Sequence, residues 1–461
     1  MLNRKLIRSC LLASVLLLAG CSFLTELRLD MADRLFGREP PNPPAELKEI
    51  TPTLSVKLNW STQVGKTARY DYSPAVEAGA VYAANAEGEL AKWDIESGRQ
   101  IWRVNAEEAI SGGVGVGGGL VMVGTNRGHV IAYDFSGKLV WKAQLSSEIL
   151  SAPQYADSLV IVRSGDNHLY GLDAIDGSTK WVYERKVPAL SLRSAAGFVV
   201  DGGAVYAGFS GGKMAAVRAD NGKLLWEATV AIPKGVTEIE RIADITSLPV
   251  VFGPVVYAVA YQGRIAAIDR LTGKVLWNRE ISSYSGIAHD DTKIYVSHVL
   301  GSVYSLNDDT GRTYWRQGDL SNRRLTTPLV LKDYVAVGDL EGYIHFLDIE
   351  NGQFAARIKI DDEAVMSMVK GESPLKLVAA TRGGGLYSVS IGNKSIPKAT
   401  PLPKPKSQVE SIQDEAEAEI TTDADEDESE GQRSILFEQD SVFSPAPRES
   451  SGPGITLPRA Q

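Results

Sequence analysis

The chain has 461 residues, of which 44% are hydrophobic and 44 are glycines, and its formal net charge at pH 7 is −9. The acidic balance and the lack of a basic patch in the sequence exclude nucleic acid as a plausible ligand. Only two cysteines are present, Cys10 and Cys21, which excludes a scaffold built on several disulfides.

Residues 1–20 have the pattern of a secretory signal peptide. Three basic residues, Arg4, Lys5 and Arg8, precede the apolar run LLASVLLLAG. This run is too short to span a bilayer as a helix of the mature protein. The sequence therefore predicts a leader that is removed, and Cys10 with it.

The leader ends in the tetrapeptide Leu18-Ala19-Gly20-Cys21, which resembles the bacterial lipoprotein box. The resemblance implies cleavage before Cys21 and lipidation of this residue; the alternative is a plain signal peptide with an incidental cysteine. Ser22 follows, and the lack of Asp at this position resembles lipoproteins sorted to the outer membrane. We therefore expect a lipid-anchored protein at the outer membrane that faces the periplasm and retains no thiol for a disulfide or for catalysis.

Residues 21–53 show no clear strand pattern and contain the proline-rich stretch REPPNPP at 38–44. Such a composition is typical of a linker. We expect this segment to tether the lipidated cysteine to a folded domain that begins near residue 54.

A short phrase that occurs seven times marks the folded domain. It consists of Asp or Asn, a few variable residues, Gly, three more residues and Trp, and in the last copy Ala356 replaces Trp. Because Gly takes positive φ without a steric clash, each phrase predicts the turn of a β-hairpin. The glycines are Gly98, Gly137, Gly177, Gly222, Gly273, Gly311 and Gly352, and the tryptophans are Trp102, Trp141, Trp181, Trp226, Trp277 and Trp315.

Two more strands are expected upstream of each turn, because alternating apolar residues precede it, as in SPAVEAGAVYAAN at 73–85. Units of four strands at a period of about 42 residues are typical of propeller blades. The eighth unit lacks an outer strand, which LSVKLNW (54–60), ending in Trp60, would supply from the other end of the chain. We therefore predict an all-β fold in which residues 54–393 form an eight-bladed β-propeller of four-stranded antiparallel blades, closed by the N-terminal strand.

Residues 394–461 change composition to Pro, Ser, Glu and Asp and include DEAEAEITTDADEDESE at 414–430. Such a segment cannot bury enough apolar surface to offset the entropy of ordering its backbone, so we expect a disordered acidic tail. Two short apolar spots, SILF (434–437) and VF (442–443), leave open a linear motif that orders on a partner.

Residues suited to catalysis or metal binding form no recognisable motif. The glycine-rich stretches 112–119 and 381–385 are not followed by a helix pattern, as a phosphate-binding loop would be. The histidines fall in different repeats without metal-ligand spacing: His129, His168, His289, His298 and His345.

The phrase itself resembles the repeat of quinoprotein dehydrogenases, in which Trp packs between blades. Those enzymes carry a vicinal Cys-Cys pair beside the quinone and an Asp/Glu/Asn set for calcium, and this chain has no Cys-Cys pair. We therefore expect no enzyme, no catalytic residue, no cofactor and no metal. A quinoprotein-type dehydrogenase is the alternative that shares the fold.

The lipoprotein box, the tether and the eight repeats together resemble the BamB family of outer-membrane assembly lipoproteins, over about residues 1–393. The specific features are two long connections, VPALSLR at 187–193 and VTEIERIADITSLPVV at 236–251. They precede the fourth and fifth predicted blades. Connections of this kind emerge on one face of a propeller, so the two should form one contiguous surface.

The resemblance implies that this surface binds BamA, the barrel protein that inserts outer-membrane proteins. Leu190, Leu192 and Arg193 match the family's first connection, Asp244 matches the first aspartate of the second, and Thr246 replaces the other aspartate. The implied partners are BamA, other subunits of the Bam complex and nascent outer-membrane proteins. The alternative is a general periplasmic chaperone or scaffold that holds unfolded strands by β-augmentation and needs no dedicated patch.

Overall fold

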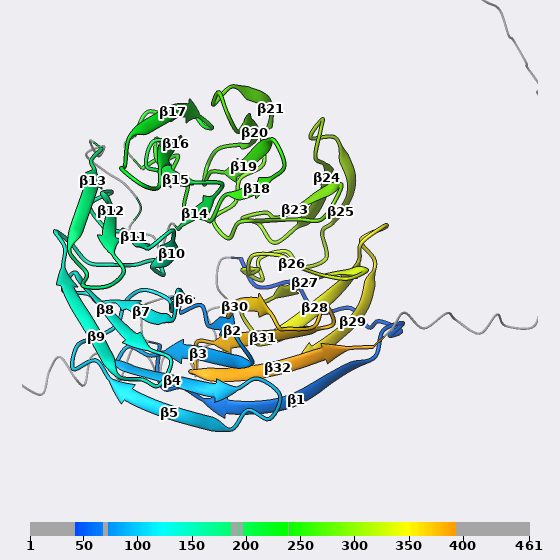
Figure 1. Ribbon diagram of the computed structural model, residues 1–461. Helices are drawn as coiled ribbons and strands as arrows, with labels where there is room; N and C mark the ends of the chain where they lie inside the picture. The colour runs from blue at the N-terminus through cyan, green and yellow to red at the C-terminus, as the bar shows by residue number, and fades with distance from the viewer. Residues whose placement is uncertain (1–41, 68–71, 186–191, 193–196, 238, 393–461) are drawn as a thin grey trace, which may run out of the picture. The chain divides into compact units, whose positions relative to one another are not determined.

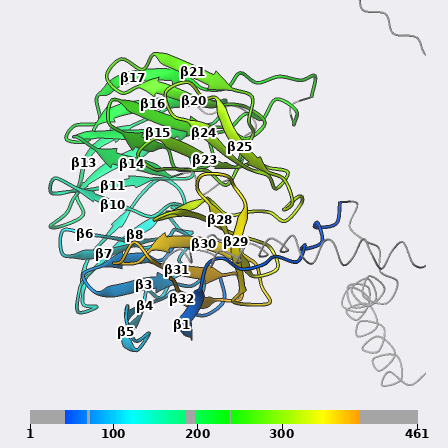
Figure 2. The same ribbon diagram turned by 90° about the vertical axis from the view of Figure 1, so that its right-hand side faces the viewer.

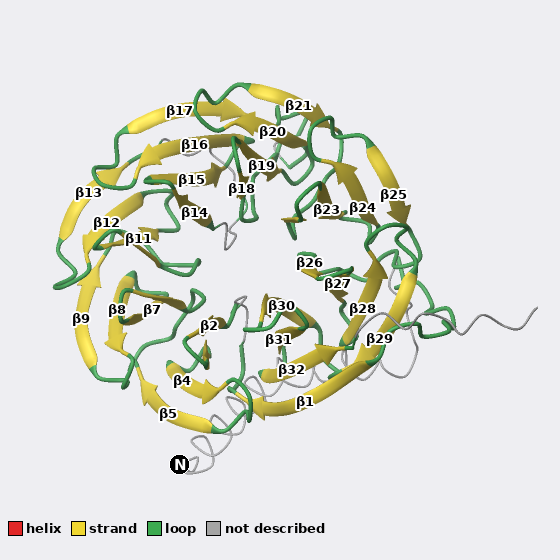
Figure 3. Ribbon diagram, turned by 45° about the vertical axis from the view of Figure 1, so that its right-hand side comes forward, coloured by secondary structure: helices red, strands yellow, loops and turns green. Residues whose placement is uncertain are grey.

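The computed structural model describes residues 42–67, 72–185, 192, 197–237 and 239–392. They form eight four-stranded antiparallel sheets, which are the blades of a propeller around a central axis (Figures 1 and 3). The predicted eight-bladed, all-β propeller is confirmed. Among these residues no helix is long and apolar enough to cross a membrane.

Each blade has an inner strand, two middle strands and an outer strand (Figure 3). The inner strands are β2 (Ala75–Glu77), β6 (Gly115–Gly117), β10 (Gln154–Ala156), β14 (Phe198–Asp201), β18 (Val250–Phe252), β22 (Ile287–His289), β26 (Leu329–Leu331) and β30 (Val365–Lys370). The second strands are β3 (Ala80–Ala84), β7 (Leu120–Gly124), β11 (Leu159–Arg163), β15 (Ala204–Phe209), β19 (Val255–Val259), β23 (Lys293–Ser297), β27 (Tyr334–Gly338) and β31 (Lys376–Thr381).

The third strands are β4 (Glu89–Asp94), β8 (His129–Asp134), β12 (Leu169–Asp173), β16 (Lys213–Arg218), β20 (Ile265–Asp269), β24 (Val303–Asn307), β28 (Tyr343–Asp348) and β32 (Gly385–Ile391). The outer strands are β5 (Gln100–Asn105), β9 (Leu139–Gln144), β13 (Thr179–Tyr183), β17 (Leu224–Thr229), β21 (Val275–Arg279), β25 (Thr313–Gln317), β29 (Phe354–Lys359) and β1 (Val56–Gln63).

The core consists of apolar layers between neighbouring blades. The second strands are apolar on both sides, and β3 and β7 are buried along their whole length, because both faces of their sheets contact a neighbouring blade. The outer strands are buried mainly at their tryptophan, as at Trp141 in β9. Each blade therefore needs a neighbour on both sides, as in other repeat architectures.

The Gly and Trp of the repeated phrase meet across these junctions. Each tryptophan Nε1–H donates to a backbone carbonyl in the turn of the following blade, at 2.7–3.0 Å. The same ring lies on the turn glycine: a Cβ on Gly98 would lie 2.6 Å from Cδ2 of Trp60, and Gly98 has φ +68°. The glycine is therefore required twice, for its positive φ and for the close approach of the indole.

The N-terminal strand closes the ring as predicted, because β1 pairs antiparallel with β32 and completes the eighth blade. This blade has no turn between its third and outer strands, since these strands come from opposite ends of the chain. Consequently Ala356 of the seventh blade has no turn glycine to cover. Leu54, only 3% exposed, shares the apolar cluster with Ala356 there instead.

The antiparallel order gives the ring two different faces. The glycine turns, together with the hairpins between inner and second strands, lie on one face, which we call the turn face. The turns between second and third strands lie on the opposite face, together with the connections from each outer strand to the next inner strand; we call it the connection face. Figure 2 shows the ring from its side, with the long connection around residue 240 extending to the right.

Part of the predicted tether contacts the ring. Residues 43–54, which we call the strap, contain no strand and run along the seventh blade, where the backbone N–H groups of Thr53 and Leu54 donate to the carbonyl of Ala355 at 2.8 and 3.2 Å. The prediction of a linker over residues 21–53 did not anticipate these contacts.

Candidate functional site

The two long connections predicted from the sequence lie next to each other on the connection face. The first joins β13 to β14 and the second joins β17 to β18. Leu192 is described in the first, whereas Leu190 and Arg193 lie outside the described residues. In the second, every residue except 238 is described.

Asp244 links these two connections. Its carboxylate accepts a hydrogen bond from the backbone N–H of Leu192 at 2.6 Å and another from that of Gly211 at 2.8 Å. Its own backbone carbonyl accepts from the N–H of Tyr261 at 2.8 Å. One buried side chain therefore joins the first connection to the fourth blade, and its backbone joins the second connection to the fifth.

The carboxylate of Asp244, which the family resemblance implies as a contact to BamA, accepts hydrogen bonds within the ring itself. The residue is only 3% exposed, and both carboxylate oxygens accept backbone N–H groups. The side chain of Leu192, by contrast, is 36% exposed. Charge-assisted hydrogen bonds to the carboxylate of Asp244 therefore hold the backbone of Leu192 and of Gly211.

A buried arginine, which sequence reasoning missed, lies near Asp244. Arg163 donates to the carbonyl of Gly208 at 2.7 Å and to Oδ1 of Asn167 at 2.5 Å, and its guanidinium lies 5.0 Å from the ring centroid of Phe209. Burial lowers the pKa of Arg163 to about 10, and the nearby charge of Asp244 opposes that shift. Arg163 thus stays charged at neutral pH. Its place at the end of the apolar strand LVIVR was the available sequence signal.

A second arginine, Arg185, also lies near the ring of Phe209. Its guanidinium lies 5.3 Å from the ring centroid of Phe209, and its Nε lies 3.3 Å from a carboxylate oxygen of Glu227. Two arginines therefore lie over one aromatic ring where the chain enters the first connection, an arrangement that favours a fixed geometry.

Four apolar side chains of the second connection are exposed. Ile232, Val236, Ile239 and Leu248 are 61%, 96%, 68% and 53% exposed. Thr246, which stands where the family resemblance places a second aspartate, donates its hydroxyl to the carbonyl of Tyr284 at 3.2 Å. The connection is therefore fixed to the ring at Asp244 and Thr246, and its exposed apolar side chains lie before Asp244 and after Thr246.

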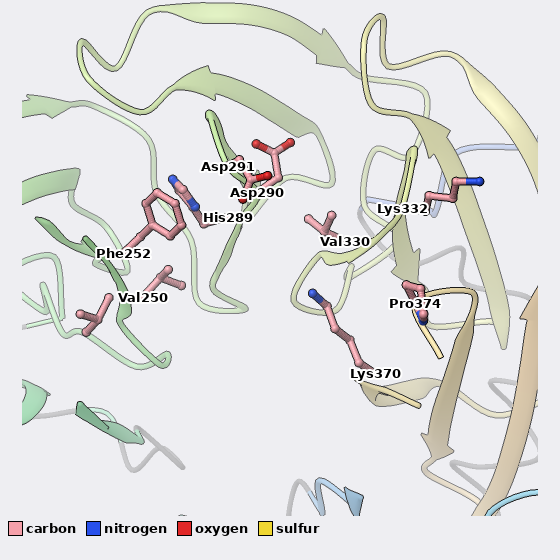
Figure 4. A pocket seen from close by; sticks show the side chains of 10 residues that line it. Val250, Phe252, His289, Asp290, Asp291, Val330, Lys332, Lys370 and Pro374 are labelled. Atoms are coloured by element: carbon pink, nitrogen blue, oxygen red, sulfur yellow. The ribbon is translucent and has the colours of Figure 1, made fainter. Parts of the chain in front are cut away.

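A separate cavity of about 410 Å³ opens among the hairpins of the turn face (Figure 4). The ring of Phe252 lies 4.2 Å from that of His289, whose Nε2 lies 3.2 Å from a carboxylate oxygen of Asp308. The cavity is lined by Val250, Val251, Phe252, His289, Asp290, Asp291, Val330, Lys332, Lys370 and Pro374. It belongs to the hairpins of blades five to eight, on the face opposite Leu192.

The described histidines make local contacts within their own parts of the ring. His129 contacts Glu108 at 2.8 Å, His168 contacts Asp166 at 2.9 Å, and His345 contacts Asp339 at 2.8 Å. In the part of the chain that the structure describes, no three His, Cys, Asp or Glu side chains are grouped so that they could hold a metal ion.

Comparison with known proteins shows which family this chain resembles. The family model for outer membrane protein assembly factor BamB matches residues 86–317. The protein of that name from Bordetella pertussis is 38% identical over 341 residues, covering 74% of this chain and 88% of the relative. The Escherichia coli protein of the same name is 33% identical over 401 residues, covering 84% of this chain and 99% of the relative.

Comparison with solved structures gives the same family. BamB from Moraxella catarrhalis superimposes with a TM-score of 0.67 at 28% identity, over 73% of this chain and 100% of that chain. A europium-containing methanol dehydrogenase superimposes with a TM-score of 0.60 at 12% identity, over 73% of this chain and 93% of that chain, a likeness of fold alone. The chain belongs to the family of the outer membrane protein assembly factor BamB.

Proposed function

We propose that this protein is a non-catalytic assembly factor for outer-membrane proteins, and that it binds BamA through the two long connections of its connection face. Lipid on Cys21 would hold it at the outer membrane, with the ring in the periplasm. The family supports the assembly role, since the relatives are named outer membrane protein assembly factors.

The proposal that these connections bind BamA rests mainly on the hydrogen bonds of Asp244. Its carboxylate fixes the backbone of Leu192 while the leucine side chain is 36% exposed. Ordering an exposed apolar side chain before binding lowers the entropic cost of association. Leu190 and Arg193, which the family resemblance adds to the surface, would complete a centre of two apolar side chains and one guanidinium, and Arg is among the residues enriched at interface hot spots.

The proposal separates contact residues from positioning residues. Leu190, Leu192 and Arg193 would contact BamA, and Asp244 would act through Leu192. Replacing Leu192 or Arg193 by Ala should weaken binding by about 1–3 kcal/mol, as for interface anchors elsewhere. Asp244→Asn should also weaken binding, because an amide offers one acceptor oxygen for the two N–H groups that the carboxylate now accepts.

The test measures the affinity of the lipid-free chain for purified BamA, with circular dichroism to verify the fold of each variant. Leu271→Ala is the matched control, because Leu271 is an exposed leucine (85%) on the opposite, turn face. Wild-type affinity in folded Leu192→Ala and Arg193→Ala variants would assign BamA binding to another surface. A chain that captures unfolded barrel proteins equally well with or without these changes would instead favour a general chaperone.

A further inference from the structure

The strap connects the two faces of the ring. At the turn-face end of β29, Leu54 is buried and bonded to Ala355. At the connection face, the N–H of Ala45 donates to the carbonyl of Ser321 at 2.9 Å, and the side chain of Asn322 donates to the carbonyl of Pro43 at 3.2 Å. Ser321 and Asn322 belong to the connection between β25 and β26, so the strap crosses the whole height of the blade.

A buried arginine holds the connection-face end of the strap. Arg323 is 2% exposed; its Nη1 donates to the carbonyl of Ala45 at 2.8 Å and its Nε to Asp339 at 2.7 Å, and its other nitrogen contacts Glu341. Asp339 itself has no exposed surface. Because this guanidinium is paired and buried, its bond to the strap is fixed in direction and shielded from solvent.

A second arginine holds the middle of the strap through the same network. Arg357 donates to the carbonyl of Lys48 at 3.1 Å and, through Nε, to Nδ1 of His345 at 3.0 Å. Since an arginine N–H can only donate, Nδ1 of His345 is unprotonated and its Nε2–H donates to Asp339 at 2.8 Å. Two arginines joined through His345 and Asp339 therefore donate to two backbone carbonyls of the strap. These bonds hold the strap against the ring.

This path decides where the chain leaves the ring. Without the strap, the segment before β1 would depart from the turn face at Ser55. With the strap, Asn42 lies at the connection face, beside the loop that contains Asn322. Figure 2 shows the blue strap extending to the same side of the ring as the long connection around residue 240.

We propose that the connection face is the face of the ring that is turned toward the lipid bilayer, because the strap delivers the lipidated N-terminus to it. This inference rests on the proposed lipidation of Cys21. Cys21 lies 21 positions before Asn42 in the sequence. The lipid and the BamA surface would thus be engaged from one side, which raises the effective concentration of each for the other.

Exposed apolar side chains alone do not distinguish the two faces, since Val236 on the connection face is 96% exposed and Leu271 on the turn face is 85% exposed. These two positions are therefore well-matched sites for probes. The only cysteines of the full chain are Cys10 in the predicted leader and Cys21, so Val236→Cys or Leu271→Cys introduces a single reactive thiol into the lipidated protein.

The experiment places a donor dye at position 236 or 271 of the full-length lipidated protein on vesicles of phosphatidylethanolamine and phosphatidylglycerol that contain an acceptor-labelled lipid. Energy transfer at position 236 should exceed that at position 271 by roughly twofold or more, because strands of five to six residues separate the faces by about 17–20 Å. Equal transfer at the two positions would overturn the proposed orientation.

Strap variants test whether the strap is the cause. Ala45→Pro removes the N–H that donates to Ser321, and Leu47→Glu places a charge where Leu47 packs against the cluster between blades six and seven. The double variant leaves Arg323 and Asp339 in place and should abolish the asymmetry. Lys48→Ala is the control, since it removes only an exposed ion pair with Asp319 and should keep the asymmetry.

The outcomes separate the two proposals. If vesicle binding survives Cys21→Ala, the lipid anchor of the proposed function fails. If binding requires Cys21 but transfer is equal at positions 236 and 271, the proposed orientation fails and the lipid anchor stands. If transfer stays asymmetric in the double strap variant, the orientation stands and only the role of the strap fails. The measurement uses vesicles without BamA, so asymmetry cannot arise from a protein that covers the connection face.

Discussion

Replacing Trp60 by Ala tests the closure of the ring. Trp60 is 9% exposed, donates to the carbonyl of Ile95 at 2.8 Å and covers Gly98. Truncating a buried Trp to Ala costs about 3–5 kcal/mol through lost burial and the cavity that remains. Trp60→Phe would keep much of the apolar contact but lose the hydrogen bond, leaving a buried carbonyl without its donor at a cost of about 1–3 kcal/mol.

The assay is urea unfolding followed by circular dichroism. Trp315→Ala is the matched control, because Trp315 is also 9% exposed, donates to the carbonyl of Ile349 at 3.0 Å and covers Gly352 within a continuous stretch of blades. Equal losses in free energy of unfolding would mean that the junction formed by the two chain ends is as tight as an ordinary one. A Trp60→Ala variant within about 1 kcal/mol of the wild-type protein would refute closure by β1 as a source of stability.

Three further predictions follow from the anchor and the buried network. Cys21→Ala should release a folded, water-soluble ring from the membrane, which fractionation and circular dichroism would detect; retention in membranes lacking BamA contradicts the lipid anchor. Burial lowers the pKa of His345 below its ordinary value. As the pH falls, the unfolded chain therefore binds a proton on this residue at a higher pH than the folded chain does. The free energy of unfolding should accordingly decrease as the pH drops below ~6.5. His345→Gln, which can still donate to Asp339 and accept from Arg357, should show a weaker decrease between pH 7.5 and 5.5 in urea unfolding; an identical pH dependence excludes His345 as the cause. Protease cleavage within residues 43–54 should become faster as the pH falls over the same range in the wild-type protein, but less so in His345→Gln, because protonation of Nδ1 removes the acceptor that orients Arg357. Equal cleavage rates in the two proteins would show that protonation of His345 does not affect binding of the strap.

The blades could be predicted from the sequence because each repeat contains the residues that determine its own strands and turn. A glycine such as Gly98 requires positive φ at a turn, the alternating apolar residues before it predict strands, and a tryptophan at fixed spacing predicts contact with the next blade. Even the closure was predictable, since Trp60 stands alone before the first complete unit and Ala356 marks the place where no turn follows. These signals are local or involve nearest neighbours, so a linear sequence records them.

The positions of the two long connections were predicted, but the contacts between them were not. The lengths of the connections indicated where the proposed surface lies, yet the contacts of Asp244 depend on which way its carboxylate points. That direction is decided by N–H groups of Leu192, 52 residues away in the sequence, and of Gly211, 33 residues away. Sequence spacing contains no information about such contacts, and Arg163 was missed for the same reason.

By itself, the sequence predicted a leader and a lipoprotein box, and it determined the number of blades and the strand that closes them. Only the tertiary structure decided that residues 43–54 form a strap along the seventh blade, because its bonds join residues far apart in the sequence: Arg323 and Ala45 are 278 positions apart, and Arg357 and Lys48 are 309 apart. The strap has no periodic pattern, since backbone carbonyls of any residue type can accept from a guanidinium. Its path is fixed by the two arginines, and these are aligned only once the sixth and seventh blades have packed together.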